Sequence, residues 1–246
     1  MAYTKTVGGA NLYNLAKRNG VAMRTLSKYG TLFNINAGLV VWWKLDETTG
    51  STATDSSGNG KTGTLYNMEN DDWVAGEINN CLSFGGTDEY AANADIGSLS
   101  GDLTVSLWMK RNGVPAINER MFDLAQAALP GLNIVAEVTT GYLKLDNEGG
   151  SDTEQTIATN ICNNAWHHIV LTRTIADPVT FKIYLDGALV LTDNTGNSGS
   201  TLTRLFIAQK SIGDSPYTGL LDDVRVYNRA FSADDVTALY AVTAPA

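Results

Sequence analysis

Residues 217–236 read YTGLLDDVRVYNRAFSADDV, and this stretch decides the fold. Between Leu220 and Tyr227, apolar, β-branched and aromatic residues recur as they do in a half-buried strand. Ser232 then offers an N-cap hydroxyl, and Asp234 and Asp235 follow in the first turn, where carboxylates complement the helix dipole. We therefore expect the chain to end in a strand, a turn and a short packing helix.

Short strand patterns fill the chain before this element. The clearest are residues 38–45, 103–110 and 166–173, and a hairpin over 179–192 that turns at Asp186-Gly187. Weaker patterns cover 120–124, 132–138, 142–146 and 153–158. No helical pattern precedes residue 231, except within the first 37 residues. The sequence therefore predicts an all-β protein built as a two-sheet antiparallel sandwich.

The composition agrees with one large all-β domain. Of the 246 residues, 43% are hydrophobic, and 24 glycines against 5 prolines suit many tight turns. No apolar run approaches the roughly eighteen residues of a membrane span, and no signal peptide follows Met1. We therefore expect no membrane span and no ordinary secretion. Cys81 and Cys162 could pair, but free buried thiols are the favoured state.

The first 37 residues form a predicted N-terminal arm, ahead of a domain over residues 38–246. The arm's only charged residues are bases, whereas the whole chain has a net charge of −9; the bases are Lys5, Lys17, Arg18, Arg24 and Lys28. Because the arm is also rich in apolar residues, we expect it to dock on another copy of the chain or on a shell protein. A solvated tail is the alternative, and nucleic acid is disfavoured because the rest of the molecule would repel phosphate.

Seven segments resemble, in order, a known family. They are 41–47 (VWWKLDE), 55–60 (DSSGNG), 81–86 (CLSFGG), 105–110 (VSLWMK), 166–169 (WHHI), 181–187 (FKIYLDG) and 221–232 (LDDVRVYNRAFS). Together they make residues 38–243 resemble the laminin-G-like jelly roll of the concanavalin A-like lectin/glucanase superfamily. The resemblance implies a jelly-roll sandwich with a short C-terminal helix, to which the arm is an N-terminal extension.

Catalytic patterns are weak. The glucanases that this family includes carry alternating acids on one strand, and glycoside hydrolysis needs two carboxylates about one bond. The nearest candidates are Asp146 with Glu148 and Asp152 with Glu154, which are better interpreted as solvated hairpin ends. His167 and His168 are neighbours on a predicted strand, so they point to opposite faces and cannot act as one dyad. We therefore expect a protein that is not an enzyme.

A structural calcium ion is one expectation from the resemblance. It implicates Asp46, the backbone near Gly85, and Asp222, where the first strand, a glycine turn and the last strand would meet. The alternative is that both carboxylates cap strand ends. Residues 55–60 also resemble half of a calcium loop, but the twelfth position is Tyr66 and not the glutamate of an EF-hand.

Aromatic side chains are the candidates for a sugar site, since aromatic faces stack on apolar faces. The candidate carbohydrate-binding residues are Trp73, Tyr90, Tyr142 and Tyr217. The other tryptophans lie in segments that the family uses for its core.

The sequence leaves three functions open. The preferred hypothesis is a structural protein of a virion or another extracellular assembly, such as a phage capsid decoration or a fibre-like component, in which the arm anchors an outward-facing jelly roll. The alternative is a secreted carbohydrate-binding or adhesion module. A glycoside hydrolase is the least favoured.

Overall fold

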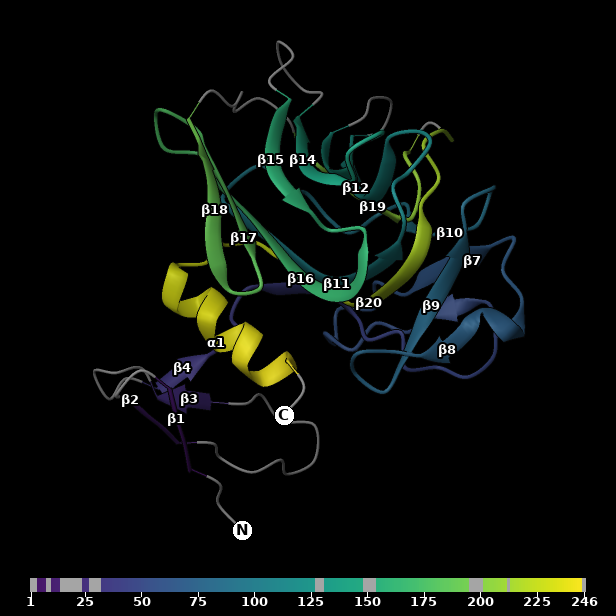
Figure 1. The fold of residues 1–246 in the computed structure, drawn as a ribbon. Coiled ribbons are helices and arrows are strands. Elements are labelled where there is room, and N and C mark those ends of the chain that lie inside the picture. The colour runs from purple at the N-terminus through teal and green to yellow at the C-terminus, as the bar shows by residue number, and fades with distance from the viewer. Residues whose placement is uncertain are drawn as a thin grey trace.

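The computed structural model describes residues 4–7, 10–13, 24–26, 32–126, 131–147, 154–194, 201–211 and 213–244. Within this part of the chain, the body is a sandwich of two antiparallel sheets with one α-helix against it (Figure 1). This confirms the predicted all-β jelly-roll class.

The first sheet has eight strands, and the aromatic site described below lies on it. Its strands, in spatial order, are β15 (Gln155–Asn160), β14 (Tyr142–Asn147), β13 (Leu132–Ala136), β12 (Glu119–Ala125), β19 (Arg204–Ile207), β10 (Tyr90–Asn93), β7 (Gly63–Tyr66) and β6 (Thr52–Ala53).

The second sheet also has eight strands. Its order is β18 (Ala188–Asp193), β17 (Thr180–Leu185), β16 (Asn163–Thr174), β11 (Leu103–Asn112), β20 (Thr218–Tyr227), β9 (Asn80–Gly85) and β8 (Trp73–Ala75), and β5 (Leu39–Trp43) pairs with β20 outside this path. A 3-10 turn, η1 (Asn70–Asp72), leads into β8.

Strand β20 is the centre of the second sheet. One edge of β20 pairs with β11. The other edge pairs with two strands: Thr218–Leu221 pair with β9, and Val224–Tyr227 pair with β5. At the change of partner Asp223 adopts a positive φ of 48°, and the register with β11 shifts between Ser106 and Trp108. A bulge of this kind re-aims side chains, and Asp222 and Asp223 lie at it.

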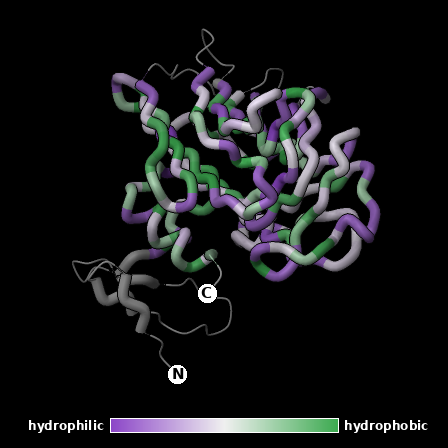
Figure 2. The backbone as a smooth tube through the Cα atoms, in the orientation of Figure 1, coloured by the Kyte–Doolittle hydropathy of each residue, from purple (hydrophilic) through white to green (hydrophobic). Residues whose placement is uncertain are grey.

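The core fills the space between the two sheets. Strand alternation sends Val105, Leu107 and Met109 of β11 inward, to meet residues such as Phe122 and Ile134 from the first sheet. In Figure 2 hydrophobic residues colour the strands in the body of the molecule, and the loops at its rim are mostly hydrophilic.

Helix α1 (Ala233–Thr243) covers the outer face of the second sheet. The Ser232 hydroxyl accepts a hydrogen bond from the Asp235 backbone N–H at 3.2 Å, and Asp235 accepts one from the Ser232 N–H at 2.7 Å, which completes a capping box. Val236 and Leu239 are buried against Tyr227 and other residues of the sheet. The predicted N-cap and the short packing helix are therefore confirmed.

The arm contains two short hairpins outside the sandwich, on the side of α1 (Figure 1). They are β1 (Thr4–Val7) with β2 (Ala10–Tyr13), and β3 (Arg24–Leu26) with β4 (Leu32–Asn34). Lys5 and Arg24 fall in these strands, whereas Lys17, Arg18 and Lys28 lie outside the described residues. At the root of the arm Ile35 is buried in the cluster beneath α1. No described helix is long and apolar enough to span a membrane.

Candidate functional site

The outer face of the first sheet carries side chains that the alternation of each strand turns away from the core. One row of cross-strand neighbours runs across six strands: Thr64, Ala92, Phe206, Asp123, Asn133 and Asp146. The row is aromatic and small on β7, β10 and β19 and polar on β12, β13 and β14, so this face has two different halves.

Three aromatic rings stand in contact on the first half. Tyr66 and Tyr90 are directly opposite each other on β7 and β10, with ring centroids 4.4 Å apart and planes 8° from parallel. The Phe206 ring is 6.3 Å from that of Tyr90 at 29°. Tyr66 remains 41% exposed. Contact between cross-strand aromatic residues stabilises the sheet, and here it also builds a solvent-facing wall.

Beside this wall lies a cavity of about 230 Å³, which we call the aromatic pocket. It is lined by Thr62, Thr64, Tyr66, Tyr90, Ala92, Asn93, Ala94, Arg204 and Phe206. The side chains of Thr64 and Ala92 are short, so they leave the space between the tyrosines and Arg204 open. The guanidinium carbon of Arg204 lies 5.0 Å from the centre of the Phe206 ring.

Three hydroxyl groups of the aromatic pocket are available to a ligand. Within the described part of the chain, the hydroxyls of Thr64, Tyr66 and Tyr90 make no hydrogen bond. Burial, together with Tyr66 nearby, raises the pKa of Tyr90, so its hydroxyl stays protonated at neutral pH and can donate. The pocket therefore joins apolar ring surface to hydrogen-bonding groups, which suits an amphipathic ligand.

The polar half of the same face is closed. Arg120 donates from Nη2 to Asp146 Oδ2 at 2.7 Å and from Nη1 to the Ser215 hydroxyl at 2.6 Å, and the Ser211 N–H donates to Asp123 Oδ2 at 2.8 Å. The segment that carries Ser211 and Ser215 thus reaches over the strands, and Asp123 is fully buried. Burial raises the pKa of Asp123.

Two of the four acids considered for catalysis lie in the described part of the chain, and both form ion pairs. Asp146 binds Arg120, and Glu154 lies 2.5 Å from Lys144. Glu148 and Asp152 lie outside the described residues.

A serine and a histidine do meet, beneath α1. Ser106 Oγ lies 2.8 Å from His168 Nε2, and the rings of Trp108 and Tyr240 pack beside the imidazole. Burial, and then the nearby Arg225, lowers the pKa of His168 to about 3. Asp186 accepts the backbone N–H of His168 and not its ring, so no relay forms and no substrate can reach the pair.

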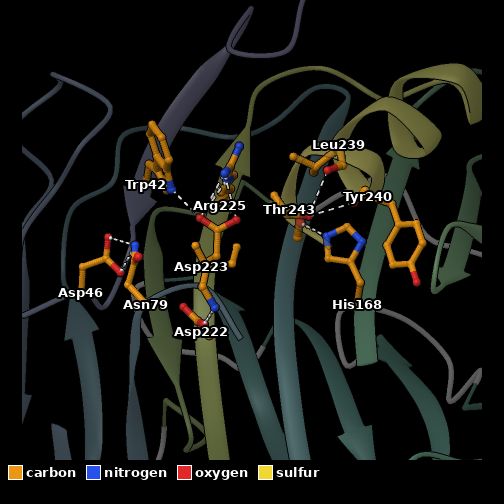
Figure 3. A network of polar contacts seen from close by, with 12 residues as sticks. Trp42, Asp46, Asn79, His168, Asp222, Asp223, Arg225, Leu239, Tyr240 and Thr243 are labelled. Carbon is orange, nitrogen blue, oxygen red and sulfur yellow. Dashed lines mark hydrogen bonds and ion pairs between the residues drawn. The ribbon is translucent and has the colours of Figure 1, made fainter. Parts of the chain in front are cut away.

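Two of the three candidate calcium residues meet at one turn (Figure 3). The Asn79 amide donates to both Asp46 oxygens at 3.2 and 3.3 Å, and the Ile78 N–H donates to Asp222 Oδ2 at 2.8 Å. Gly85 lies apart from them, opposite Thr218 near the other end of β9.

The chemistry around Asp222 fits a cation in one respect. Its side chain is fully buried, and Oδ1 has no partner among the described residues. Burial, together with the charges of Asp223 and Asp46, raises the pKa of Asp222 to about 8. No group of three or more His, Cys, Asp or Glu side chains in the described part of the chain could hold a metal. Calcium would therefore need backbone or amide oxygens besides Asp46 and Asp222.

Residues 55–60 form a structural loop. Asp55 accepts hydrogen bonds from the backbone N–H groups of Trp42, Ser57 and Lys61 at 2.8 to 3.0 Å. Burial raises the pKa of Asp55, but these hydrogen bonds outweigh it, and the pKa falls below its ordinary value. The carboxylate is thus already saturated by the chain.

The four aromatic candidates lie in different places. Tyr90 lines the aromatic pocket. Tyr142 is half-buried on β14 and does not line it, whereas Trp73 and Tyr217 are packed in the core, where the Tyr217 hydroxyl donates to the Lys110 carbonyl at 3.2 Å. The two cysteines are free and buried, as expected, and burial raises their pKa values to about 12 for Cys81 and about 11 for Cys162.

Sequence reasoning did not select Tyr66, Arg204 or Phe206. The available signal was alternation: Leu65 and Leu205 are core residues, so their neighbours in β7 and β19 face outward. Which outward residues become neighbours depends on strand pairing, which no single segment shows.

Solved structures share this fold. Domain 4 of AbnA, a GH43 extracellular arabinanase from Geobacillus stearothermophilus in complex with arabinotriose, is 21% identical, with a TM-score of 0.62 over 83% of this chain and 98% of that one. A structure of botulinum neurotoxin type C is 17% identical over 86% of this chain and 52% of its own, with a TM-score of 0.65. Cell entry of that toxin depends on interaction with two ganglioside molecules. A Trypanosoma rangeli sialidase in complex with the inhibitor DANA is 15% identical over 83% of this chain and 33% of its own, with a TM-score of 0.64.

At these identities the structures show a shared fold. This chain spans about half of the toxin chain and a third of the sialidase chain. A comparison with curated proteins found no match. A family profile, however, matches residues 84–237, more than half of the chain. The chain belongs to the concanavalin A-like lectin/glucanase superfamily.

Proposed function

We propose that this chain is a non-catalytic carbohydrate-binding module and that the aromatic pocket is its ligand site. The observation that carries the proposal is the pocket itself, in which stacked rings, small floor residues and unused hydroxyls face solvent together. A sugar ring has apolar C–H faces and hydroxyl edges, so it matches both kinds of surface.

The size of the pocket indicates a small ligand unit. Its volume of about 230 Å³ is below the roughly 300–1,000 Å³ of pockets that take drug-sized ligands. A pocket of this size suits one sugar ring better than a long segment of a chain. A longer glycan would therefore place one residue in the pocket and extend from it over the sheet.

The comparisons support a sugar as the ligand. The AbnA domain was solved with arabinotriose, and the neurotoxin study concerns gangliosides. Both share this fold with the present chain, although their identities are too low to transfer a site.

The lining of the pocket favours binding without hydrolysis. None of the described residues that line it is Asp or Glu, whereas most glycoside hydrolases need two carboxylates at the scissile bond. A sugar held there would meet no general acid.

A glycan array followed by calorimetry tests the proposal. We expect wild-type protein to bind at least one glycan, Tyr66→Ala to weaken that binding at least tenfold by removing a wall of the pocket, and Tyr142→Ala to leave it unchanged. Tyr142 is a matched control because it is a tyrosine of the same sheet outside the pocket. Equal losses in both variants, or no binding on the array, would reject the aromatic pocket as a glycan site.

The virion role expected from the sequence stays a prediction, as does docking of the arm on another copy or on a shell protein. Light scattering of the full chain and of a chain that starts at Gly38 tests whether the arm mediates self-association. Association of the full chain alone would support an assembly role for the arm, and two monomers would count against self-assembly.

We also keep the structural calcium ion as a proposal, with Asp46 and Asp222 as its carboxylate ligands. The unpartnered Oδ1 of Asp222 supports it. Such an ion would hold β20 to the turn that follows β8 and would take no part in chemistry.

A further inference from the structure

Two tyrosine hydroxyls of the aromatic pocket lie close to each other. Tyr66 and Tyr90 are directly opposite on β7 and β10, so their side chains leave the sheet on the same face. Their rings are stacked, with centroids 4.4 Å apart and planes 8° from parallel. Burial raises the pKa of Tyr90, and the electrostatic influence of Tyr66 raises it further. The two hydroxyls are therefore near enough to influence each other.

The packing of this cluster does not require the hydroxyls. Phe206 takes part in the same ring cluster without one. In the core, by contrast, the hydroxyl of Tyr217 is used, since it donates to the Lys110 carbonyl at 3.2 Å. Within the described part of the chain, the hydroxyls of Tyr66 and Tyr90 bond neither to other groups nor to each other. Both keep their full hydrogen-bonding capacity for a ligand.

We infer that Tyr66 and Tyr90 together recognise two hydroxyls on neighbouring carbons of a sugar ring, one sugar hydroxyl for each tyrosine. The inference rests on the proposed function and specifies its ligand class, a sugar residue with a free vicinal diol. A hydroxyl carries one donor and can accept two hydrogen bonds, so a tyrosine and a sugar hydroxyl can satisfy each other. Neighbouring carbons hold their hydroxyls side by side, as the stacked rings hold theirs.

Deoxygenated sugars test which hydroxyls are recognised. Calorimetry on the full chain compares the methyl pyranosides of glucose, galactose, mannose, xylose and arabinose, and the one that binds most tightly becomes the parent. Each monodeoxy derivative of the parent is then measured. We expect loss of either of two adjacent hydroxyls to weaken binding roughly three- to tenfold, as the net strength of one hydrogen bond implies, and loss of any other hydroxyl to matter less.

Tyr66→Phe and Tyr90→Phe assign one sugar hydroxyl to each tyrosine. Each variant keeps the stacked ring and removes a single hydroxyl, so it should weaken the parent by the same three- to tenfold. Each should have no further effect on the one deoxy sugar that lacks its partner, which makes a double-mutant cycle. Tyr142→Phe, outside the pocket on the same sheet, is the matched control and should bind as wild type. Unchanged thermal unfolding shows that all three variants are folded.

The outcomes separate the inference from the proposed function. Unchanged affinity in both pocket variants, a single sensitive position on the sugar, two sensitive positions that are not adjacent, or additive losses in the cycles would overturn the inference. So would array binding when none of the five methyl pyranosides binds. In each case, glycan binding that weakens in Tyr66→Ala would still uphold the pocket as a glycan site. No glycan binding at all would overturn both.

Discussion

The two outer faces of the sandwich both carry rings in contact, but only the rings on the second sheet lie under a helix. On the first sheet Tyr66 is exposed, Tyr90 is half-buried and Phe206 is buried, and all three line the aromatic pocket. On the second sheet the rings of Trp108 and His168 pack with Tyr240 of α1, at 5.0 to 5.8 Å between centroids. The same kind of side chain on the same kind of strand is thus a binding surface or a core residue, depending on whether a helix lies over it.

The covered face should respond most strongly to loss of packing. Leu239→Ala, in the helix face that meets the sheet, should lower the free energy of unfolding by about 2–5 kcal/mol, because it leaves a cavity in a buried cluster. Leu189→Ala is the matched control, since Leu189 is 51% exposed and should cost under about 1 kcal/mol. Urea denaturation measures both, and similar losses would show that α1 does not seal a core.

The second largest effect should come from low pH, which reduces the stability of the fold at the covered face. Because burial lowers the pKa of His168 from 6.5 to about 3, the unfolded chain binds a proton between these values while the folded chain does not. Stability is therefore lost as pH falls from 6.5 towards 3. His168→Gln should flatten this part of the profile. Parallel pH profiles for the two proteins would contradict the assignment.

Calcium binding should affect stability at a buried carboxyl group of β20, which lies in register with Trp108 of the second sheet. The pKa of Asp222 is raised to about 8, so its protonated form stabilises the metal-free fold at low pH, and this contribution is lost as pH rises through 8. Calcium needs the ionised form. We expect an excess of calcium over chelator to raise the melting temperature more at pH 9 than at pH 6. At a free calcium concentration one hundred times the Kd, the ion should add about 2.7 kcal/mol to the free energy of unfolding.

Asp222→Asn serves as the control for the calcium experiment. It keeps the shape of the side chain but removes the charge, so the calcium-dependent shift should disappear. A shift of the same size in this variant would place any calcium elsewhere.

The open face should show the smallest effect on stability. Tyr66→Ala loses one stacked pair, which is worth about 0.5–1.5 kcal/mol, although the same change should abolish most glycan binding. Thermal unfolding and calorimetry on one sample compare the two readouts. If Tyr66→Ala lowers the free energy of unfolding as much as Leu239→Ala does, the stacked tyrosines belong to the core and are not an exposed binding surface.

The strands that could be predicted are those whose local pattern is complete. Strict alternation identified β11 and β16, the Asp186-Gly187 turn identified the hairpin of β17 and β18, and Ser232 identified the start of α1. The four strands of the arm were not predicted, because their segments alternate poorly and pair only with their immediate neighbours.

The candidate site was predicted only in part, because it is assembled by register. Tyr90 was selected as an exposed aromatic residue, but Tyr66, Phe206 and Arg204 become its neighbours only through the pairing of β7, β10 and β19. The sequence of one strand does not specify its partner. Trp73 and Tyr217 show the converse: an aromatic residue near a loop looks the same whether it faces solvent or the core.

The shared edge of β20 has a consequence for the newly made chain. Trp42 of β5 donates its indole N–H to Asp223 of β20, 181 positions later. At ribosomal rates of synthesis, β20 is completed on the order of ten seconds after β5. Throughout that time LVVWW is an apolar strand with an open edge, the kind of segment that aggregates. The last strand to be synthesised is thus the one that protects the first strand of the sandwich.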